Sequence, residues 1–179
     1  MSDKKAQTRE RIIKAASDAL IQRGPAEPSV GEVMGAAGLT VGGFYAHFES
    51  KDALMLEAFK QLLGRRRGMI ADMNAELTDE ERRALVAAFY LSRKHRDSTE
   101  NACPIPASIG ELGRLPDPFR EVLNEHIELM AAQLAGSPDD ADKALADIAL
   151  MVGGLALARA LGPGELSDRL LRAAKSAVR

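Results

Sequence analysis

The sequence predicts an all-α protein of about nine helices. Apolar residues recur every three or four positions in long segments, and no stretch of the 179 residues has the period-two alternation of a half-buried strand. Helix-capping and helix-breaking residues also recur at short intervals, as expected where short connections join successive helices. Such a chain folds by packing the apolar stripes of its helices against one another.

The first two predicted helices are delimited by clear start and stop signals. The first covers about residues 5–23 and ends at Gly24-Pro25. Its apolar stripe consists of Ile12, Ile13, Ala16 and Leu20. Ser29 and Glu32 then have the spacing of a capping box, in which the hydroxyl accepts a backbone N–H and the carboxylate reaches back. These two residues predict the start of a short second helix.

The later helices are predicted from the same signals. Gly38 ends the second helix, Thr40 caps a third through about residue 47, and Ser50 opens a longer fourth helix that reaches about residue 67. A further helix is predicted from the capping box Thr78–Glu81 toward Lys94, followed by a short or broken helix over 101–116. Two more helices are predicted to start at Asp117-Pro118 and at Ser137-Pro138, the second reaching about Leu161. The last helix is predicted over 166–178, after the break at 162–164.

Composition limits the class of protein. With 46% hydrophobic and 28% charged residues, the chain is typical of a globular protein rather than a disordered one. The single cysteine excludes a disulfide within the chain and fits a reducing compartment. The longest uncharged apolar stretch, 148–158, is shorter than the roughly 20 residues of a membrane span, and the charged start lacks a secretory signal. We therefore expect a cytoplasmic protein without a membrane segment.

The charge is distributed unevenly along the chain. Residues 1–67 contain eleven lysines and arginines against eight acidic residues, a net charge of +3, whereas residues 68–179 carry −5. A basic amino-terminal third followed by an acidic remainder indicates two roles, one of which faces a polyanion.

Residues 29–51 have the pattern of a helix-turn-helix. The residues of its first helix predicted to point inward are Val33, Met34 and Ala37. Gly38 would supply the positive φ of the turn. The residues predicted to pack back from the second helix are Val41, Phe44 and Phe48. The outward face would then consist of Thr40, Gly42, Gly43, Tyr45 and His47, on a helix that fits a DNA major groove. On spacing alone, such a turn could equally be a corner in a protein that never contacts DNA.

Two stretches of the chain match the pattern of a known protein family. The matching positions of the first helix and its end are Thr8, Ile12, Ala15, Ala16, Leu20 and Gly24. The denser match is the run A-G-L-T-V-G-G-F-Y-x-H-F-x-S-K-x-x-L from Ala37 to Leu54. Together they cover about the first third of the chain, and on these positions the sequence resembles the TetR family of transcriptional regulators.

The resemblance implies a dimeric DNA-binding protein that responds to a small molecule. A helix-turn-helix domain would occupy residues 1–50, and an effector-binding and dimerisation domain residues 51–179. The protein would be a repressor released from its operator by an effector, with no catalytic centre and no cofactor. The implied DNA-contacting residues are Ser29, Thr40, Val41, Gly42, Gly43, Phe44, Tyr45, His47 and Lys51. Lys4, Lys5 and Arg9 are also placed to reach backbone phosphates.

Two adjacent glycines distinguish the second helix from that of many relatives. Gly42 and Gly43 each cost roughly 1 kcal/mol relative to alanine within a helix, and neither offers a hydrogen-bonding side chain. Close approach of the backbone to the groove, or packing of Val41 against thymine methyl groups, would then carry more of the sequence readout.

The last two helices are predicted to form the dimer interface. The helix that ends near Leu161 is apolar on more than one face, so it must be buried in its own core or against a partner. The family resemblance implies a four-helix bundle shared by two subunits. The interface residues assigned on this basis are Ile148, Val152, Leu155, Leu166 and Leu170. A monomeric core with the same stripes is the alternative.

The effector pocket is predicted from apolar residues of the larger domain. The candidates are Phe59, Phe89, Cys103, Ile109, His126 and Met130, each of which could also be an ordinary core residue. Their character favours an apolar, amphipathic or electrophilic effector, and no cluster has the spacing of a metal site. Cys103 is either a reactive sensor or a small buried hydrophobe.

The sequence leaves two alternative functions. A small helical enzyme could use Cys103 with His95 or His126, but no base-orienting motif surrounds these residues. A helical interaction module that has lost DNA binding is also compatible with the double glycine.

Overall fold

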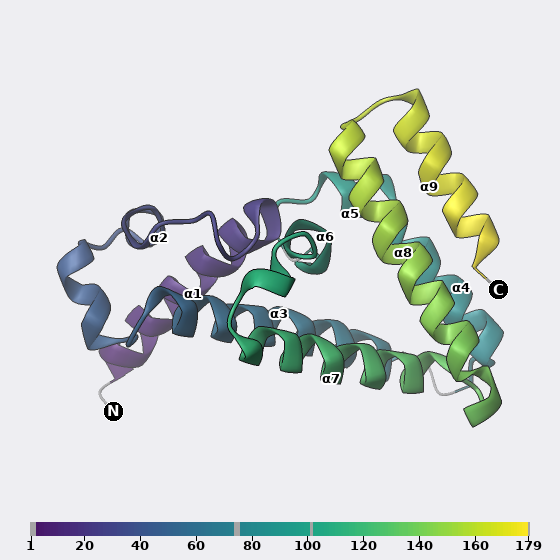
Figure 1. The fold of residues 1–179 in the computed structure, drawn as a ribbon, viewed down its shortest axis with the longest axis horizontal. Helices are drawn as coiled ribbons and strands as arrows, with labels where there is room; N and C mark the ends of the chain where they lie inside the picture. The colour runs from purple at the N-terminus through teal and green to yellow at the C-terminus, as the bar shows by residue number, and fades with distance from the viewer. Residues whose placement is uncertain (1–2, 74–75, 101, 179) are drawn as a thin grey trace. The chain divides into compact units, whose positions relative to one another are not determined.

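The computed structural model describes residues 3–73, 76–100 and 102–178, and these residues form helices and connecting loops without a strand (Figure 1). The α-helices are α1 (Asp3–Arg23), α2 (Val30–Ala36), α3 (Lys51–Ala71), α4 (Asp79–Tyr90), α5 (Arg93–Asp97), α6 (Ile105–Ser108), α7 (Asp117–Leu134), α8 (Ala141–Leu161) and α9 (Glu165–Ala177). Three 3₁₀ helices are η1 (Val41–Ala46), η2 (Leu112–Arg114) and η3 (Pro138–Asp140). The predicted all-α fold class is confirmed.

The chain packs as two compact units. The amino-terminal unit comprises Met1–Leu63 and Thr99–Val122, and the carboxy-terminal unit comprises Gly64–Ser98 and Leu123–Arg179. The first part of α3 and the segment that carries α6 and η2 therefore pack with the predicted helix-turn-helix. The functional division at residue 50 remains a prediction.

The amino-terminal unit is built around the apolar stripe of α1. Ile12, Ala16 and Leu20 are completely buried, and α1 packs against α2 and α6. The helix ends at Arg23 because Gly24 adopts a φ of +78°, a left-handed conformation that favours glycine. The predicted end of the first helix is thus confirmed.

Both predicted capping boxes are present. The Ser29 hydroxyl accepts the Glu32 N–H at 3.2 Å while the Glu32 carboxylate accepts the Ser29 N–H at 2.8 Å. These bonds, together with an ion pair to Arg23, lower the pKa of Glu32 to about 2. The box formed by Thr78 and Glu81 opens α4 in the same way. Capping residues therefore determine where these two helices begin.

Three predicted helices differ in detail. The helix expected to run toward Lys94 stops at Tyr90, and α5 starts anew because the Ser92 side chain caps the N–H of His95. Pro138 opens the 3₁₀ turn η3 before α8 rather than α8 itself. The second helix of the helix-turn-helix is the 3₁₀ helix η1. Among the described residues 102–116, the helical elements are the short α6 and η2, as predicted for a broken helix; residue 101 lies outside the described residues.

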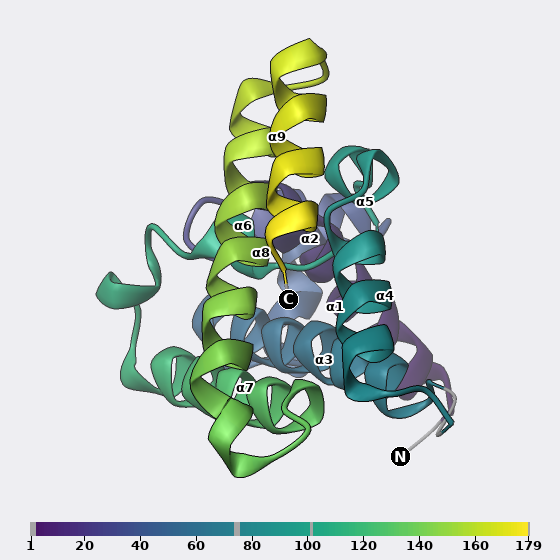
Figure 2. The same ribbon diagram turned by 90° about the vertical axis from the view of Figure 1, so that its right-hand side faces the viewer.

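In the carboxy-terminal unit, α8 and α9 form an antiparallel pair with α4 and α5 beside them (Figure 2). A Cβ atom at Gly154 would lie 3.0 Å from Ala174 and 3.1 Å from Leu91, so the glycine allows close approach of these helices. Arg96 of α5 donates to the Ser167 hydroxyl at 2.9 Å and to Asp168 at 2.8 Å. Packing and this polar contact together hold α9 in place.

One segment of the described residues, Pro138–Leu161, is long and apolar enough to cross a membrane by length and composition. This segment extends beyond the uncharged stretch 148–158. This is weak evidence for a membrane span, because the core helix of a globular protein meets the same criteria. Within the unit, α8 buries one face that includes Ile148, Met151 and Leu155.

His95 and His126 are buried in the carboxy-terminal unit beside arginines. Arg66 donates to His95 Nε2 at 2.9 Å, and Arg67 donates to His126 Nδ1 at 3.1 Å, because a guanidinium can only donate. Burial lowers the pKa of His95 to about 3 and that of His126 to about 4, and the nearby arginine charges are the second cause. Both imidazoles are therefore neutral at pH 7.

We predict that the free energy of unfolding decreases as the pH falls from about 6.5 toward 4. In the unfolded chain both histidines take up protons between pH 7 and pH 5, whereas in the folded chain they stay neutral. Each histidine therefore lowers the free energy of unfolding by about 2 kcal/mol over this range. Urea unfolding at pH 7, 6 and 5 measures the slope, and His126→Gln should flatten it relative to the wild type. Parallel slopes for the two proteins would contradict the assignment.

Candidate nucleic-acid interface

A tight turn at Gly38 joins α2 to η1. The N–H groups of Gly38 and Leu39 donate to the carbonyls of Gly35 and Met34, respectively, both at 2.9 Å. This pair of hydrogen bonds defines a Schellman motif, which requires a left-handed residue at its centre. Gly38 has a φ of +67°, as the sequence predicts.

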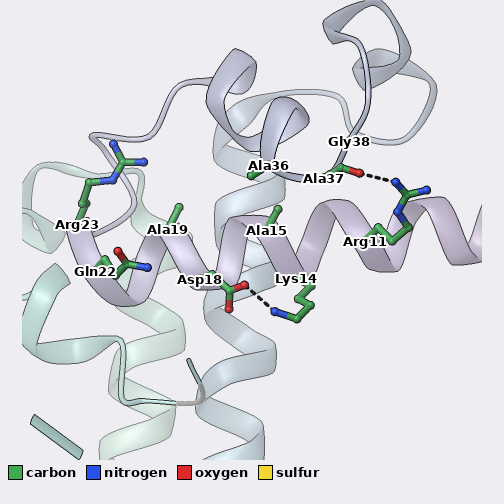
Figure 3. A pocket seen from close by; sticks show the side chains of 10 residues that line it. All are labelled: Arg11, Lys14, Ala15, Asp18, Ala19, Gln22, Arg23, Ala36, Ala37 and Gly38. Atoms are coloured by element: carbon green, nitrogen blue, oxygen red, sulfur yellow. Dashed lines mark hydrogen bonds and ion pairs between the residues drawn. The ribbon is translucent and has the colours of Figure 1, made fainter. Parts of the chain in front are cut away.

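Arg11 holds α1 against this turn. Its Nη2 donates to the Ala37 carbonyl at 2.6 Å. The positive charge of Arg11 also interacts favourably with the helix dipole at the carboxyl end of α2. Figure 3 shows Arg11 at one end of an open hollow of about 620 Å³ between α1 and α2, where Lys14 and Asp18 form an ion pair of 2.7 Å. No local pattern in the sequence marks Arg11, because its acceptor lies 26 residues away.

Phe44 anchors η1 to the rest of the unit. Its buried ring lies edge-on to Tyr45, with centroids 5.2 Å apart, and stacks on Phe48 at 5.9 Å. Arg9 of α1 lies over the Phe48 ring at 4.7 Å and donates both terminal nitrogens to the Glu57 carboxylate. Arg9, predicted to reach a phosphate, is thus engaged in tying α1 to α3.

The opposite side of η1 faces solvent. The side chain of Tyr45 is 74% exposed, and Thr40 occupies the capping position without making a side-chain capping bond. Val41 is 50% exposed, and its Cγ2 lies 3.9 Å from where a Cβ atom at Gly31 of α2 would be, so it packs back against α2 only in part. A helical side chain leans toward the amino terminus, and the first residue of a helix therefore projects past its end.

Gly42 and Gly43 are not required by the fold of the unit. A Cβ atom at Gly42 would meet nothing within 4 Å, and one at Gly43 would meet only the Met34 side chain at an ordinary 3.9 Å. Neither residue has the positive φ found at Gly38. Their bare backbone is exposed on the outward face, where a second molecule could approach closely.

The remaining predicted DNA-contacting residues have different environments. The Ser29 hydroxyl is used in the capping box, and the Lys51 ammonium donates to a backbone carbonyl of the loop between α1 and α2. His47 is half-buried, and its Nδ1 has no hydrogen-bond partner in the described part of the chain. Lys4 and Lys5 are exposed in the first turns of α1. The set therefore comprises one exposed face and several fixed residues around it.

The predicted effector residues are divided between the two units. Phe59, Cys103 and Ile109 belong to the amino-terminal unit, and Phe89, His126 and Met130 to the carboxy-terminal unit. Ile109 and Phe89 are about half exposed, whereas the other four are buried. A hollow of about 500 Å³ lies at the end of α7, η3 and the start of α8, but none of the six lines it.

The predicted dimer residues are also placed differently from one another. Ile148, Val152 and Leu155 are buried within the single chain, whereas Leu166 is 59% exposed and Leu170 is half-buried. The exposed leucines of α8 itself are Leu145, Leu157 and Leu161. An apolar surface therefore remains on these helices, formed mainly by residues other than those assigned from the sequence.

Comparison with known proteins shows which proteins this chain is similar to. Residues 12–58 match the family model for bacterial regulatory proteins of the tetR family. The chain is 27% identical over 166 residues to the uncharacterized HTH-type transcriptional regulator YerO of Bacillus subtilis (strain 168). This match covers 87% of the chain and 54% of the relative, so the chain spans about half the length of that curated protein.

Solved structures share the fold. The reduced form of E. coli NemR has a TM-score of 0.81 at 19% identity, covering 97% of this chain and 95% of that one. A TetR family transcriptional regulator from Agrobacterium tumefaciens has a TM-score of 0.79 at 18% identity, with coverages of 96% and 97%. The fatty acid degradation regulator FadR from Bacillus halodurans has a TM-score of 0.70 at 17% identity, with coverages of 95% and 93%.

We predict opposite effects of alanine at two glycines of the helix-turn-helix. Gly42→Ala should raise the free energy of unfolding by about 0.5–1 kcal/mol, because the added methyl group meets open space and the unfolded chain loses entropy. Gly38→Ala should lower it by more than about 1 kcal/mol, because its φ is positive and Arg11 lies close by. Denaturant unfolding of both variants measures this, and a destabilised Gly42→Ala would contradict our account of η1.

Proposed function

We propose, for a chain that belongs to the TetR family of bacterial regulatory proteins, that the outward face of η1 binds the major groove of operator DNA and that the protein regulates transcription. The family consists of DNA-binding regulators rather than enzymes, which agrees with the expectation of no catalytic centre. The observation that carries the proposal is the pairing of a buried Phe44 with an exposed Tyr45 on one short helix.

The exposed face of η1 supplies groups suited to a duplex. The Thr40 hydroxyl and the Tyr45 phenol can hydrogen-bond phosphate oxygens, and the first N–H groups of a helix lack acceptors within it. The backbone at Gly42 and Gly43 can approach base edges more closely than a backbone with side chains. Recognition would then combine phosphate contacts with close fit to the groove, and Val41 would contact thymine methyl groups.

Two copies of the chain would bind two half-sites. One short helix contacts too few base pairs for operator specificity, so a second subunit supplies a second recognition helix. The exposed leucines of α8 and α9, namely Leu157, Leu161 and Leu166, support a partner surface on these helices. The three buried residues first assigned there would contribute by shaping the core beneath it.

Repression relieved by a small effector is the regulatory mode that we propose. An effector would shift the population toward a state whose recognition helices no longer match successive major grooves. Met130 and His126 are the buried candidates in the carboxy-terminal unit, and both histidines there are neutral, which suits an apolar or amphipathic molecule. Cys103 is buried, which favours a core role over a reactive sensor. The proposed location is the cytoplasm.

We predict that Tyr45→Ala weakens DNA binding about tenfold or more without changing stability. The phenol is exposed, so the fold loses little, whereas the complex loses a phosphate contact and packing area. Binding is measured by fluorescence anisotropy on duplexes that the wild type selects from a random pool, with the upstream region of its own gene as a second probe. Tyr45→Phe separates the hydroxyl from the ring. Undiminished binding by Tyr45→Ala would contradict the assigned face.

We also predict that Leu157→Arg combined with Leu166→Glu produces monomers with much weaker operator binding. The control is Leu129→Arg, which changes another exposed leucine, on α7. Analytical ultracentrifugation reports the oligomeric state of each variant. Retention of the dimer by the double variant, or its loss in the control, would exclude this surface as the interface.

A further inference from the structure

We propose that Glu111 is a positioning residue for DNA binding, because it fixes the loop to which the Lys51 ammonium is anchored. This inference rests on the proposed function. The loop consists of residues 24–28 and joins α1 to α2, and Glu111 belongs to the segment between α6 and η2 that packs in the same unit. Glu111 lies 60 positions beyond Lys51 in the chain and outside the helix-turn-helix.

Both charged side chains bind the same residue of the loop. The Ala26 N–H donates to Glu111 Oε1 at 3.2 Å, and the Ala26 carbonyl accepts from Lys51 Nζ. A carboxylate at the N–H and an ammonium at the carbonyl both give charge-assisted hydrogen bonds. Ala26 thereby connects two opposite charges that make no ion pair with each other in the described residues.

The backbone of Glu111 is itself held in place. Its N–H donates to the Ser108 carbonyl at 3.0 Å, and the buried Ser108 hydroxyl donates to the Pro104 carbonyl at 2.9 Å. The Glu111 carboxylate lies where a side chain at Gly24 would be, so only glycine there permits this contact. The loop therefore meets a prebuilt acceptor rather than a mobile surface side chain.

Fixing the loop restricts Lys51 at the point where DNA contacts are expected. Lys51 is the first residue of α3, directly after the helix-turn-helix, and its ammonium has two further donors for a phosphate. A side chain already held in position loses less conformational entropy on binding. The same loop leads into Ser29, whose capping bond starts α2.

Two neighbouring substitutions separate positioning from charge. Glu111→Gln keeps an oxygen that can accept the Ala26 N–H but removes a negative charge that repels phosphates, so this variant should bind a duplex as tightly as the wild type or more tightly. Glu111→Ala removes the same charge together with the acceptor, and we expect about fivefold weaker binding. A purely electrostatic role requires both variants to bind more tightly. Glu121→Ala, at an exposed glutamate of α7, is the matched control for loss of charge.

A double-mutant cycle then tests the route through Lys51. In a Lys51→Ala background, Glu111→Ala should cost less than about twofold, because the anchored ammonium is already absent. Binding is measured by anisotropy on the selected duplex, with urea unfolding of every variant as the stability control. An equal loss in both backgrounds, or a loss also seen with Glu111→Gln, would overturn the proposal.

Exchange of the Ala26 amide hydrogen provides a readout that does not depend on DNA. It should be faster in Glu111→Ala than in the wild type, and close to the wild type in Glu111→Gln and Glu121→Ala. Unchanged exchange in Glu111→Ala would refute the loop contact even if DNA binding is intact. A wild-type protein that binds no duplex while the exchange pattern holds would instead refute the proposed function and, with it, the positioning of Lys51 for DNA.

Discussion

The candidate interface depends on the complete burial of Phe44. A six-residue 3₁₀ helix has too few internal hydrogen bonds to be stable alone, so its position is determined by what it packs against. Phe44 supplies that contact, and Phe48, Arg9 and Glu57 extend it from η1 to α1 and α3. Because one face of η1 is thereby fixed inward, Tyr45 and the two glycines must face solvent.

The turn before η1 imposes the second constraint. Two backbone hydrogen bonds close the Schellman motif, and Gly38 accepts the left-handed conformation that this closure demands. Arg11 then covers the carboxyl end of α2. The backbone conformation at Gly38 requires glycine, whereas no contact inside the subunit requires glycine at Gly42, four residues later. Under the proposed function, the open backbone at Gly42 is the part of η1 that can approach a duplex closely.

Long-range polar contacts surround this motif. The Arg9–Glu57, Arg11–Ala37, Lys51–Ala26 and Ala26–Glu111 bonds each join residues at least 25 positions apart. They connect α1, the loop before α2, α3 and the segment before η2 into one body. In the carboxy-terminal unit, Arg96 plays a comparable part by joining α5 to α9, while Arg66 and Arg67 hold two neutral histidines.

The sequence by itself determined the features that depend on neighbouring residues: the helical class, both capping boxes, the left-handed Gly38 and the breaks at Gly24 and after Leu161. These are local because caps and turns involve residues within about four positions of one another. Only the tertiary structure decided which apolar side chains of α8 are used up in the subunit core, which basic residues of α1 are engaged, and that Glu111 packs against the loop before α2. Such outcomes depend on which segments far apart in the sequence pack against one another, and a local sequence pattern carries no information on that packing.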